Sequence, residues 1–142
     1  MIAKLVSEYA ESDILSKATE NCMLQIDKYE QGKNLFNELV KDKPYIIRNI
    51  ALNFLFESET PFLDIDRSIM ENYCYFAATV ASIKLIGYLT MLWKPDIHTF
   101  LIYASQFIRG MYASLDVRGE EVFKTLKENN CFSPAHIAMM MK

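Results

Sequence analysis

Residues 73–93, Tyr-Cys-Tyr-Phe-Ala-Ala-Thr-Val-Ala-Ser-Ile-Lys-Leu-Ile-Gly-Tyr-Leu-Thr-Met-Leu-Trp, form an almost unbroken apolar run with one charged residue, Lys84. A run of this length can cross a lipid bilayer, but a charge near its middle costs about 3 kcal/mol there. The flanking residues, Glu71 and 94–96, include no basic cluster. Because the central helix of a bundle can be apolar nearly all round, we interpret the run as a buried helix and predict no integral membrane segment.

Helical patterns lie on both sides of this run. Apolar residues recur at three- and four-residue spacing, whereas the period of two that is typical of strands is missing. We expect helices at about 2–9, 13–30, 33–41, 44–56, 65–93, 97–115, 122–126 and 135–141. The sequence therefore predicts an all-α fold: a single domain over residues 1–142, with about seven or eight helices around an apolar central helix.

Breaks and caps separate these helices. Gly32 is expected to end the second helix, and Pro44 suits the first turn of the fourth. Asp96 is expected to cap the helix that follows the apolar run, and residues 116–119 are predicted to form a turn. Ser133 is expected to cap the last helix in the same way.

Composition excludes several classes of protein. Of the 142 residues 51% are hydrophobic, and Gly and Pro number four each, which indicates a compact chain. The net charge is −3 and the chain has no run of Lys or Arg, so the sequence does not indicate a nucleic-acid-binding protein. Cys22, Cys74 and Cys131 have no metal-site or redox spacing, so we expect reduced thiols.

Residues for catalysis are scarce. His98 and His136 have no His, Cys or carboxylate partner at the spacing of metal ligands. The chain has no Gly-rich phosphate loop and no nucleophile elbow. We therefore expect no enzyme, no cofactor and no metal, and a small helical enzyme of unknown activity is the weakest alternative.

Arg48 stands in the first turn of the apolar helix that follows Pro44. An arginine is costly to bury unpaired. It could extend to solvent, pair with Glu38 or Asp42, or lie at the rim of a groove where it would meet a carboxylate of a partner.

Two segments resemble a known family. Residues 35–40, Leu-Phe-Asn-Glu-Leu-Val, and residues 48–56, Arg-Asn-Ile-Ala-Leu-Asn-Phe-Leu-Phe, are together similar to the first homology region of the Bcl-2 family of apoptosis regulators. Ile47 stands where that family has a glycine. Residues 93–96, Trp-Lys-Pro-Asp, resemble its second homology region without the usual glycine pair. The short C-terminus is typical of the copies that large DNA viruses carry.

The resemblance implies an anti-apoptotic viral protein that sequesters the BH3 helix of pro-apoptotic host proteins in a hydrophobic groove. Arg48 would take the aspartate of that helix. Such a protein would act in the host cytoplasm, peripherally at mitochondria. The implied partner-binding residues are Arg48, Ile47, Asn49, Leu52, Phe36, Leu39, Val40, Ile26 and Tyr29.

An alternative keeps the fold without the groove. Some viral relatives use the same bundle as a scaffold that inhibits host inflammatory signalling through surface or dimer contacts. Ile47 in place of glycine favours this alternative. An exposed apolar groove also favours self-association, so a homodimer is a further option.

Overall fold

In the computed structural model, the described residues are 6, 26–57, 66–112 and 115–142, and they contain six helices and no strand. The all-α prediction is confirmed for this part of the chain, although it holds fewer helices than the seven or eight expected. The predicted helix at 2–9 lies outside the described residues except for Val6. The helices are α3 (Ile26–Val40), α4 (Tyr45–Glu57), α5 (Ile69–Trp93), α6 (Ile97–Tyr112), α7 (Leu115–Glu128) and α8 (Pro134–Met141).

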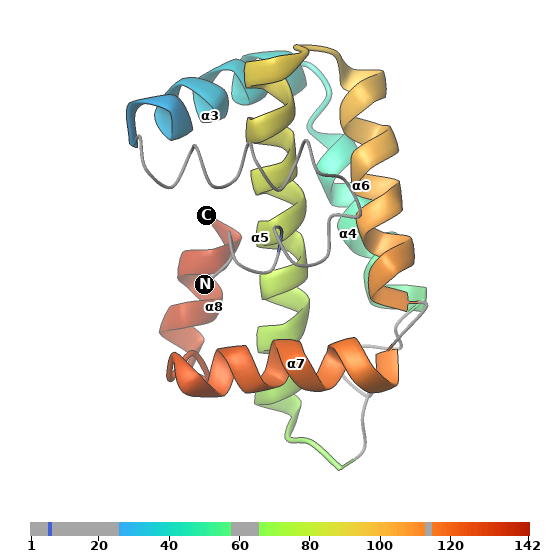
Figure 1. Ribbon diagram of the computed structural model, residues 1–142, viewed down its shortest axis with the longest axis vertical. Coiled ribbons are helices and arrows are strands. Elements are labelled where there is room, and N and C mark those ends of the chain that lie inside the picture. Colours follow the sequence, from blue (N-terminus) through green and yellow to red (C-terminus); the bar gives the residue numbers. More distant parts are fainter. Residues whose placement is uncertain (1–5, 7–25, 58–65, 113–114) are drawn as a thin grey trace.

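Helix α5 runs through the middle of the bundle, with the other helices around it (Figure 1). Most of its residues are buried. Its buried hydroxyls Thr79, Ser82 and Thr90 each donate to the carbonyl oxygen four residues earlier, at 3.1, 2.8 and 2.6 Å. These bonds satisfy the hydroxyls within the helix, so α5 can be buried on nearly all sides. The prediction of an apolar central helix is confirmed.

Helix α5 is also long and apolar enough to cross a membrane by length and composition. However, 72% of its most apolar stretch is buried by the rest of the protein. Burial of this kind is what a core helix requires, and the absence of a membrane segment stays a prediction.

Helix α5 begins with a capping box. The backbone N–H of Glu71 donates to Ser68 Oγ at 3.2 Å, and the backbone N–H of Ser68 donates to Glu71 Oε2 at 2.9 Å. The reciprocal bonds satisfy two backbone donors that the helix cannot satisfy itself. The helix therefore begins at Ile69, after the expected start at residue 65.

Helices α3 and α5 approach closely through two glycines. A Cβ atom on Gly32 would lie 2.5 Å from the carbonyl oxygen of Tyr88, and one on Gly87 would lie 2.5 Å from the Phe36 ring. The expectation that Gly32 ends a helix was wrong, because Gly32 lies inside α3 and its missing side chain permits this contact. The two helices expected at 13–30 and 33–41 are accordingly continuous from Ile26 to Val40.

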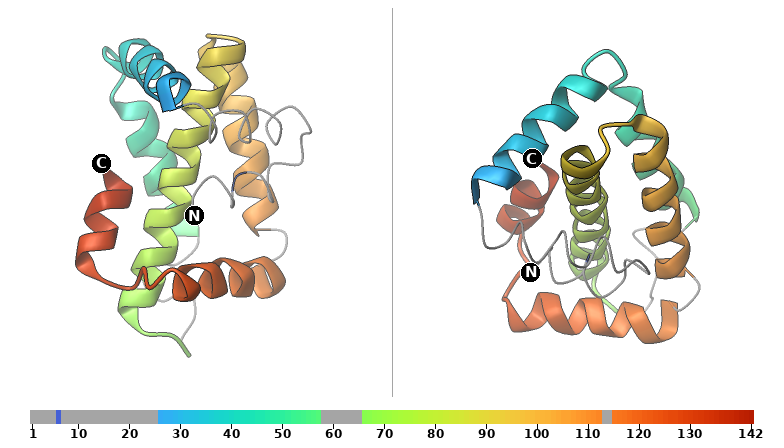
Figure 2. Two further views of the ribbon diagram at one scale, coloured as in Figure 1. Left: turned by 60° about the vertical axis from the view of Figure 1, so that its left-hand side comes forward. Right: turned by 45° about the horizontal axis from the view of Figure 1, so that its top comes forward.

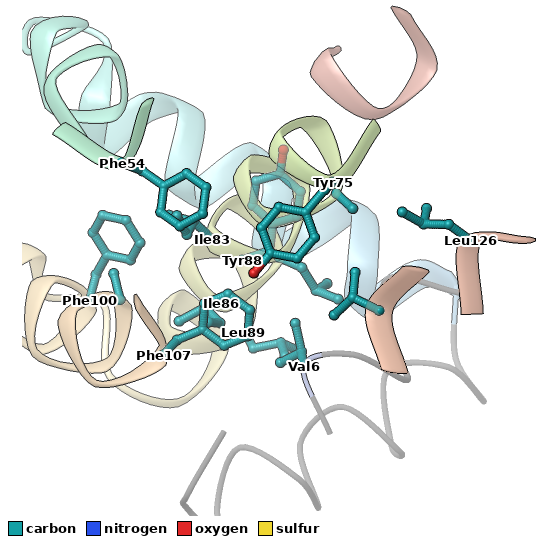
Figure 3. Close-up of a cluster of buried hydrophobic side chains, with 14 of the residues drawn as sticks. Val6, Phe54, Tyr75, Ile83, Ile86, Tyr88, Leu89, Phe100, Phe107 and Leu126 are labelled. Carbon is teal, nitrogen blue, oxygen red and sulfur yellow. The ribbon is translucent and has the colours of Figure 1, made fainter. Parts of the chain in front are cut away.

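The core is built largely from aromatic rings. Phe36 makes edge-to-face contacts with Tyr88 and Phe100, at centroid distances of 5.6 and 5.0 Å. Tyr75 stacks on Phe54 at 6.3 Å (Figure 3). Such pairs add about 1 kcal/mol each to the burial of their surface.

Two predicted caps are confirmed and one predicted turn was wrong. The backbone N–H of Thr99 donates to Asp96 Oδ2 at 2.8 Å, and that of His136 donates to Ser133 Oγ at 3.4 Å. Residues 116–119, predicted as a turn, lie inside α7. Val122 and Leu126 of this helix pack in the core, which supports a longer helix than the local sequence indicates.

Candidate functional site

Most apolar residues of the predicted groove pack against the core. Phe36 is only 2% exposed. Four others are partly buried against the same core: Tyr29, Leu39, Val40 and Ile47. Ile26 is the first residue of α3, and its side chain is outside the described part. These side chains hold α3 and α4 to the bundle.

The polar members of the predicted groove lie on the surface. Arg48 and Asn49 are exposed. Glu38 pairs with Lys41 at 3.7 Å, and no ion pair joins Arg48 to any residue within the described ranges. Of the three possibilities for Arg48 given by the sequence, the structure therefore favours extension of the side chain into solvent.

Helix α4 turns a different face to the core than expected. Phe54 is buried, and Ile50 is partly buried against the same core. Leu52 and Phe56 are exposed, Phe56 at 73%. Leu52, one of the implied partner-binding residues, lies on the face of α4 turned away from α5, because the 3.6-residue period places it opposite the inward-facing Phe54.

A pair of aromatic side chains lies at the surface where α5 leads into α6. Trp93 is the last residue of α5 and Tyr103 lies in α6; their ring centroids are 5.8 Å apart and their planes are tilted by 56°. Trp93 is 49% exposed. Tyr103 is partly buried against the core, so the indole supplies most of the solvent-exposed surface of the pair.

The turn between α5 and α6 is held by hydrogen bonds. The backbone N–H of Lys94 donates to Thr90 O at 2.7 Å, and that of Asp96 donates to Lys94 O at 2.7 Å. Asp96 Oδ2 also accepts from Thr99 Oγ1 at 2.7 Å. Hydrogen bonds from the side chain and backbone of Thr99 hold the pKa of Asp96 below its usual value, which favours the carboxylate form three residues after Trp93.

The two thiols in the described part of the chain are buried. Cys74 and Cys131 are free, as predicted, and Cys22 lies outside the described residues. Cys74 Sγ donates to the carbonyl oxygen of Cys131 at 3.3 Å. Burial raises the pKa of the Cys74 thiol, which keeps it protonated and a poor nucleophile.

A second aromatic cluster lies at the other end of α5. The guanidinium carbon of Arg67 is 3.8 Å from the centroid of Phe123, whose ring stacks on Tyr75 at 5.2 Å. Arg67 also pairs with Glu120. Within the described ranges, no group of three His, Cys, Asp or Glu side chains could hold a metal ion.

One protein family matches this chain. The model of the FliB lysine N-methylase C-terminal domain matches residues 2–140. The chain belongs to this family. The match includes α3 to α7 and nearly all of α8. No curated protein and no solved structure matches the chain.

The FliB C-terminal domain family overturns the resemblance to Bcl-2 proteins. The similar segments cover two short stretches, whereas the FliB family model covers almost the whole chain. A Leu-Phe helix, a break and an apolar helix are features that any helical bundle can contain, so the short pattern misled the interpretation. Viral origin, anti-apoptotic function and the scaffold alternative in inflammatory signalling were all wrong.

Other expectations that depended on the resemblance were also wrong. The pro-apoptotic BH3 partner and the groove-based homodimer rested on it, as did the location in host cytoplasm at mitochondria. The expectation of no enzyme was also wrong, because the family is a domain of a lysine N-methylase. Sequence reasoning placed Trp93 at the end of the apolar run and in the resemblance, placed Asp96 in the resemblance and as a cap, and missed Tyr103.

Proposed function

We propose that this chain acts in lysine N-methylation, as the C-terminal domain of a methylase. The observation that carries the proposal is the family match over residues 2–140. Methyl transfer to lysine needs a site for the methyl donor and a site that holds the lysine side chain in line with the bond that breaks.

The described residues do not fit a binding site for a nucleoside-type methyl donor. Such donors need backbone that approaches the ligand closely, which glycines in loops commonly provide. Gly32 and Gly87 lie inside helices, and the space beside them is filled by Tyr88 and Phe36. We therefore assign no step of the transfer to these residues.

Recognition of the protein that carries the lysine is the role that the described surface supports. Large apolar side chains are exposed on α4 and at the junction of α5 and α6, among them Phe56 and Trp93. Exposed aromatic residues are enriched where proteins bind one another. Arg48, Asn49 and Leu52 of the predicted site are exposed on the same α4, and a contact from them to a protein partner stays a prediction.

We also propose that residues 1–142 form a single domain. The family match runs without a break from residue 2 to residue 140. Helix α5 contacts all five other described helices, so one core serves them all.

The proposal can be tested in the source organism. Lysine methylation across the proteome is measured by mass spectrometry in a strain that lacks the gene and in the same strain with the gene restored. We expect one or a few lysine sites to lose methylation and to regain it on restoration. Identical methylation in the two strains, with the protein present in the restored one, would contradict the proposal.

A further inference from the structure

The two aromatic clusters at the ends of α5 differ in one respect. At the N-terminal end, the chain places its own cation, Arg67, over the ring of Phe123. At the C-terminal end, no cation from the described residues lies over Trp93 or Tyr103. Aromatic faces attract cations electrostatically, and tryptophan does so best. The second cluster therefore has the rings of a cation site without a cation from these residues.

The geometry suits a small, rounded cation. Trp93 is 49% exposed, so a ligand can contact the indole, and the Tyr103 ring, 5.8 Å from it, is close enough to contact the same ligand. The hydrogen bonds of the turn at 94–96 fix the start of α6 relative to the end of α5. The pair is thus built before any ligand arrives, which lowers the cost of binding.

The charges nearby are balanced. The carboxylate of Asp96 lies in the turn, and Lys94 beside it helps to lower the pKa of Asp96. Asp96 can attract a cation, while Lys94 opposes its approach. Lysine and trimethyl-lysine carry the same single positive charge, so these two residues act on both alike, and contact with the rings decides between the two ligands.

We infer that Trp93 and Tyr103 bind an alkylammonium group, and that the ligand is the methylated ε-ammonium group of lysine in a protein. The ligand class rests on the proposed function, because a lysine N-methylase produces this group. Unmethylated lysine is strongly hydrated and binds less well, whereas methyl groups weaken hydration and add apolar contact with the rings. The site would hold the product, or a partly methylated lysine that awaits another methyl group.

The only tryptophan of the chain is Trp93, so its fluorescence reports on this site alone. The full chain is titrated with one short peptide that carries lysine, dimethyl-lysine, trimethyl-lysine or a neutral analogue with a tert-butyl group in place of the trimethylammonium. We expect affinity to rise with methylation. The neutral analogue should bind about twofold to thirtyfold more weakly than trimethyl-lysine, the range that a cation–π contact supports.

Variants test whether peptide binding depends on the Trp93–Tyr103 pair or on another part of the surface. Tyr103→Leu should weaken binding of the trimethyl-lysine peptide, whereas Tyr103→Phe should retain it because the ring is kept. Tyr45→Leu is the matched control, since Tyr45 is a tyrosine with 49% exposure on α4. Circular dichroism establishes that each variant is folded, and Tyr103→Phe provides the second comparison if Tyr103→Leu is not.

The outcomes are distinct from those of the gene deletion. Equal binding of trimethyl-lysine and its neutral analogue, or no fluorescence change at millimolar peptide, would overturn the site whatever the role of the protein in methylation. Selective binding of trimethyl-lysine, together with unchanged methylation in the deletion strain, would support the site and refute the proposed function.

Discussion

At the N-terminal end of α5, the aromatic cluster of Tyr75 and Phe123 is closed in by the chain itself, whereas the Trp93–Tyr103 pair at its C-terminal end meets solvent. Tyr75 is fully buried and stacks between Phe54 and Phe123. Trp93, by contrast, is half exposed beside Tyr103. The two views of Figure 2 show α7 crossing near the first end, while α3 and α6 lie near the second. The same ring chemistry can therefore stabilise a fold at one place and remain available to a ligand at another.

Truncation of a ring should have its largest effect at the buried end. Phe123→Ala removes a side chain that contacts both Arg67 and Tyr75, and such a change costs about 3–5 kcal/mol. Trp93→Ala should cost about 1 kcal/mol or less, because much of the indole is already in water. Urea denaturation of both variants measures the difference. Similar losses in the two would remove the distinction between the ends.

Near the C-terminal end of α5, helix α3 packs so closely that Gly32 leaves no room for a side chain. Gly32→Ala would place a methyl group 2.5 Å from the backbone oxygen of Tyr88, which cannot move like a side chain. We expect a loss of about 1–3 kcal/mol, although alanine favours helices by about 1 kcal/mol over glycine. Thermal unfolding checks this expectation. A rise in the melting temperature would mean that α3 and α5 do not approach as closely as described.

The cap at the N-terminal end of α5 should make stability depend on pH. Hydrogen bonds from the side chain and backbone of Ser68 hold the pKa of Glu71 below its usual value. A group with a depressed folded pKa stabilises the protein above its unfolded pKa, and this contribution is lost as the pH falls through the folded pKa. Ser68→Ala should cost about 1 kcal/mol near neutral pH.

The test compares melting temperatures of the native protein and Ser68→Ala at about pH 7 and at about pH 3. The gap between the two proteins should shrink in acid, because the protonated Glu71 no longer gains from the bonds to Ser68. Ser105→Ala, at an exposed position inside α6, is a control without a cap. A gap that is constant with pH would show that the charge of Glu71 has no part in the cap.

The smallest effect concerns the hydroxyl of Tyr75. Its oxygen is buried and has no hydrogen-bond partner within the described residues. A buried polar group without a partner is costly, so Tyr75→Phe should leave stability unchanged or raise it by about 1 kcal/mol. Urea denaturation measures this change. A loss of more than about 1 kcal/mol would indicate that the hydroxyl does have a partner.

Local signals in the sequence predicted the parts of the fold that local physics decides. The apolar run at 73–93 identified the central helix. Asp96 and Ser133 were predicted as caps from their residue type and position, and each accepts from a backbone N–H three residues later. Gly32 was misread because glycine suits both a helix end and a close contact between helices. Only the position of α5 distinguishes these two uses.

The candidate site depends on tertiary arrangement. Trp93 and Tyr103 meet because the turn at 94–96 sets α6 beside α5, and no local pattern gives the register between two helices. Function was misread for a related reason: the Leu-Phe and arginine pattern at 35–56 is a property of packed helices as much as of one family. The family became evident only from a match along residues 2–140.

The most direct test asks whether the half-exposed Trp93–Tyr103 pair binds an alkylammonium cation. It follows the indole N–H signal of Trp93 by nuclear magnetic resonance, together with the backbone signals, as tetramethylammonium is added. Because the chain has one tryptophan, the assignment of the indole signal is unambiguous. We predict shifts at Trp93, Tyr103 and their neighbours in the turn, and none at Phe123, where Arg67 already covers the ring. Shifts at Phe123, or on the exposed face of α4 without any at Trp93, would contradict the contrast between the two ends of α5.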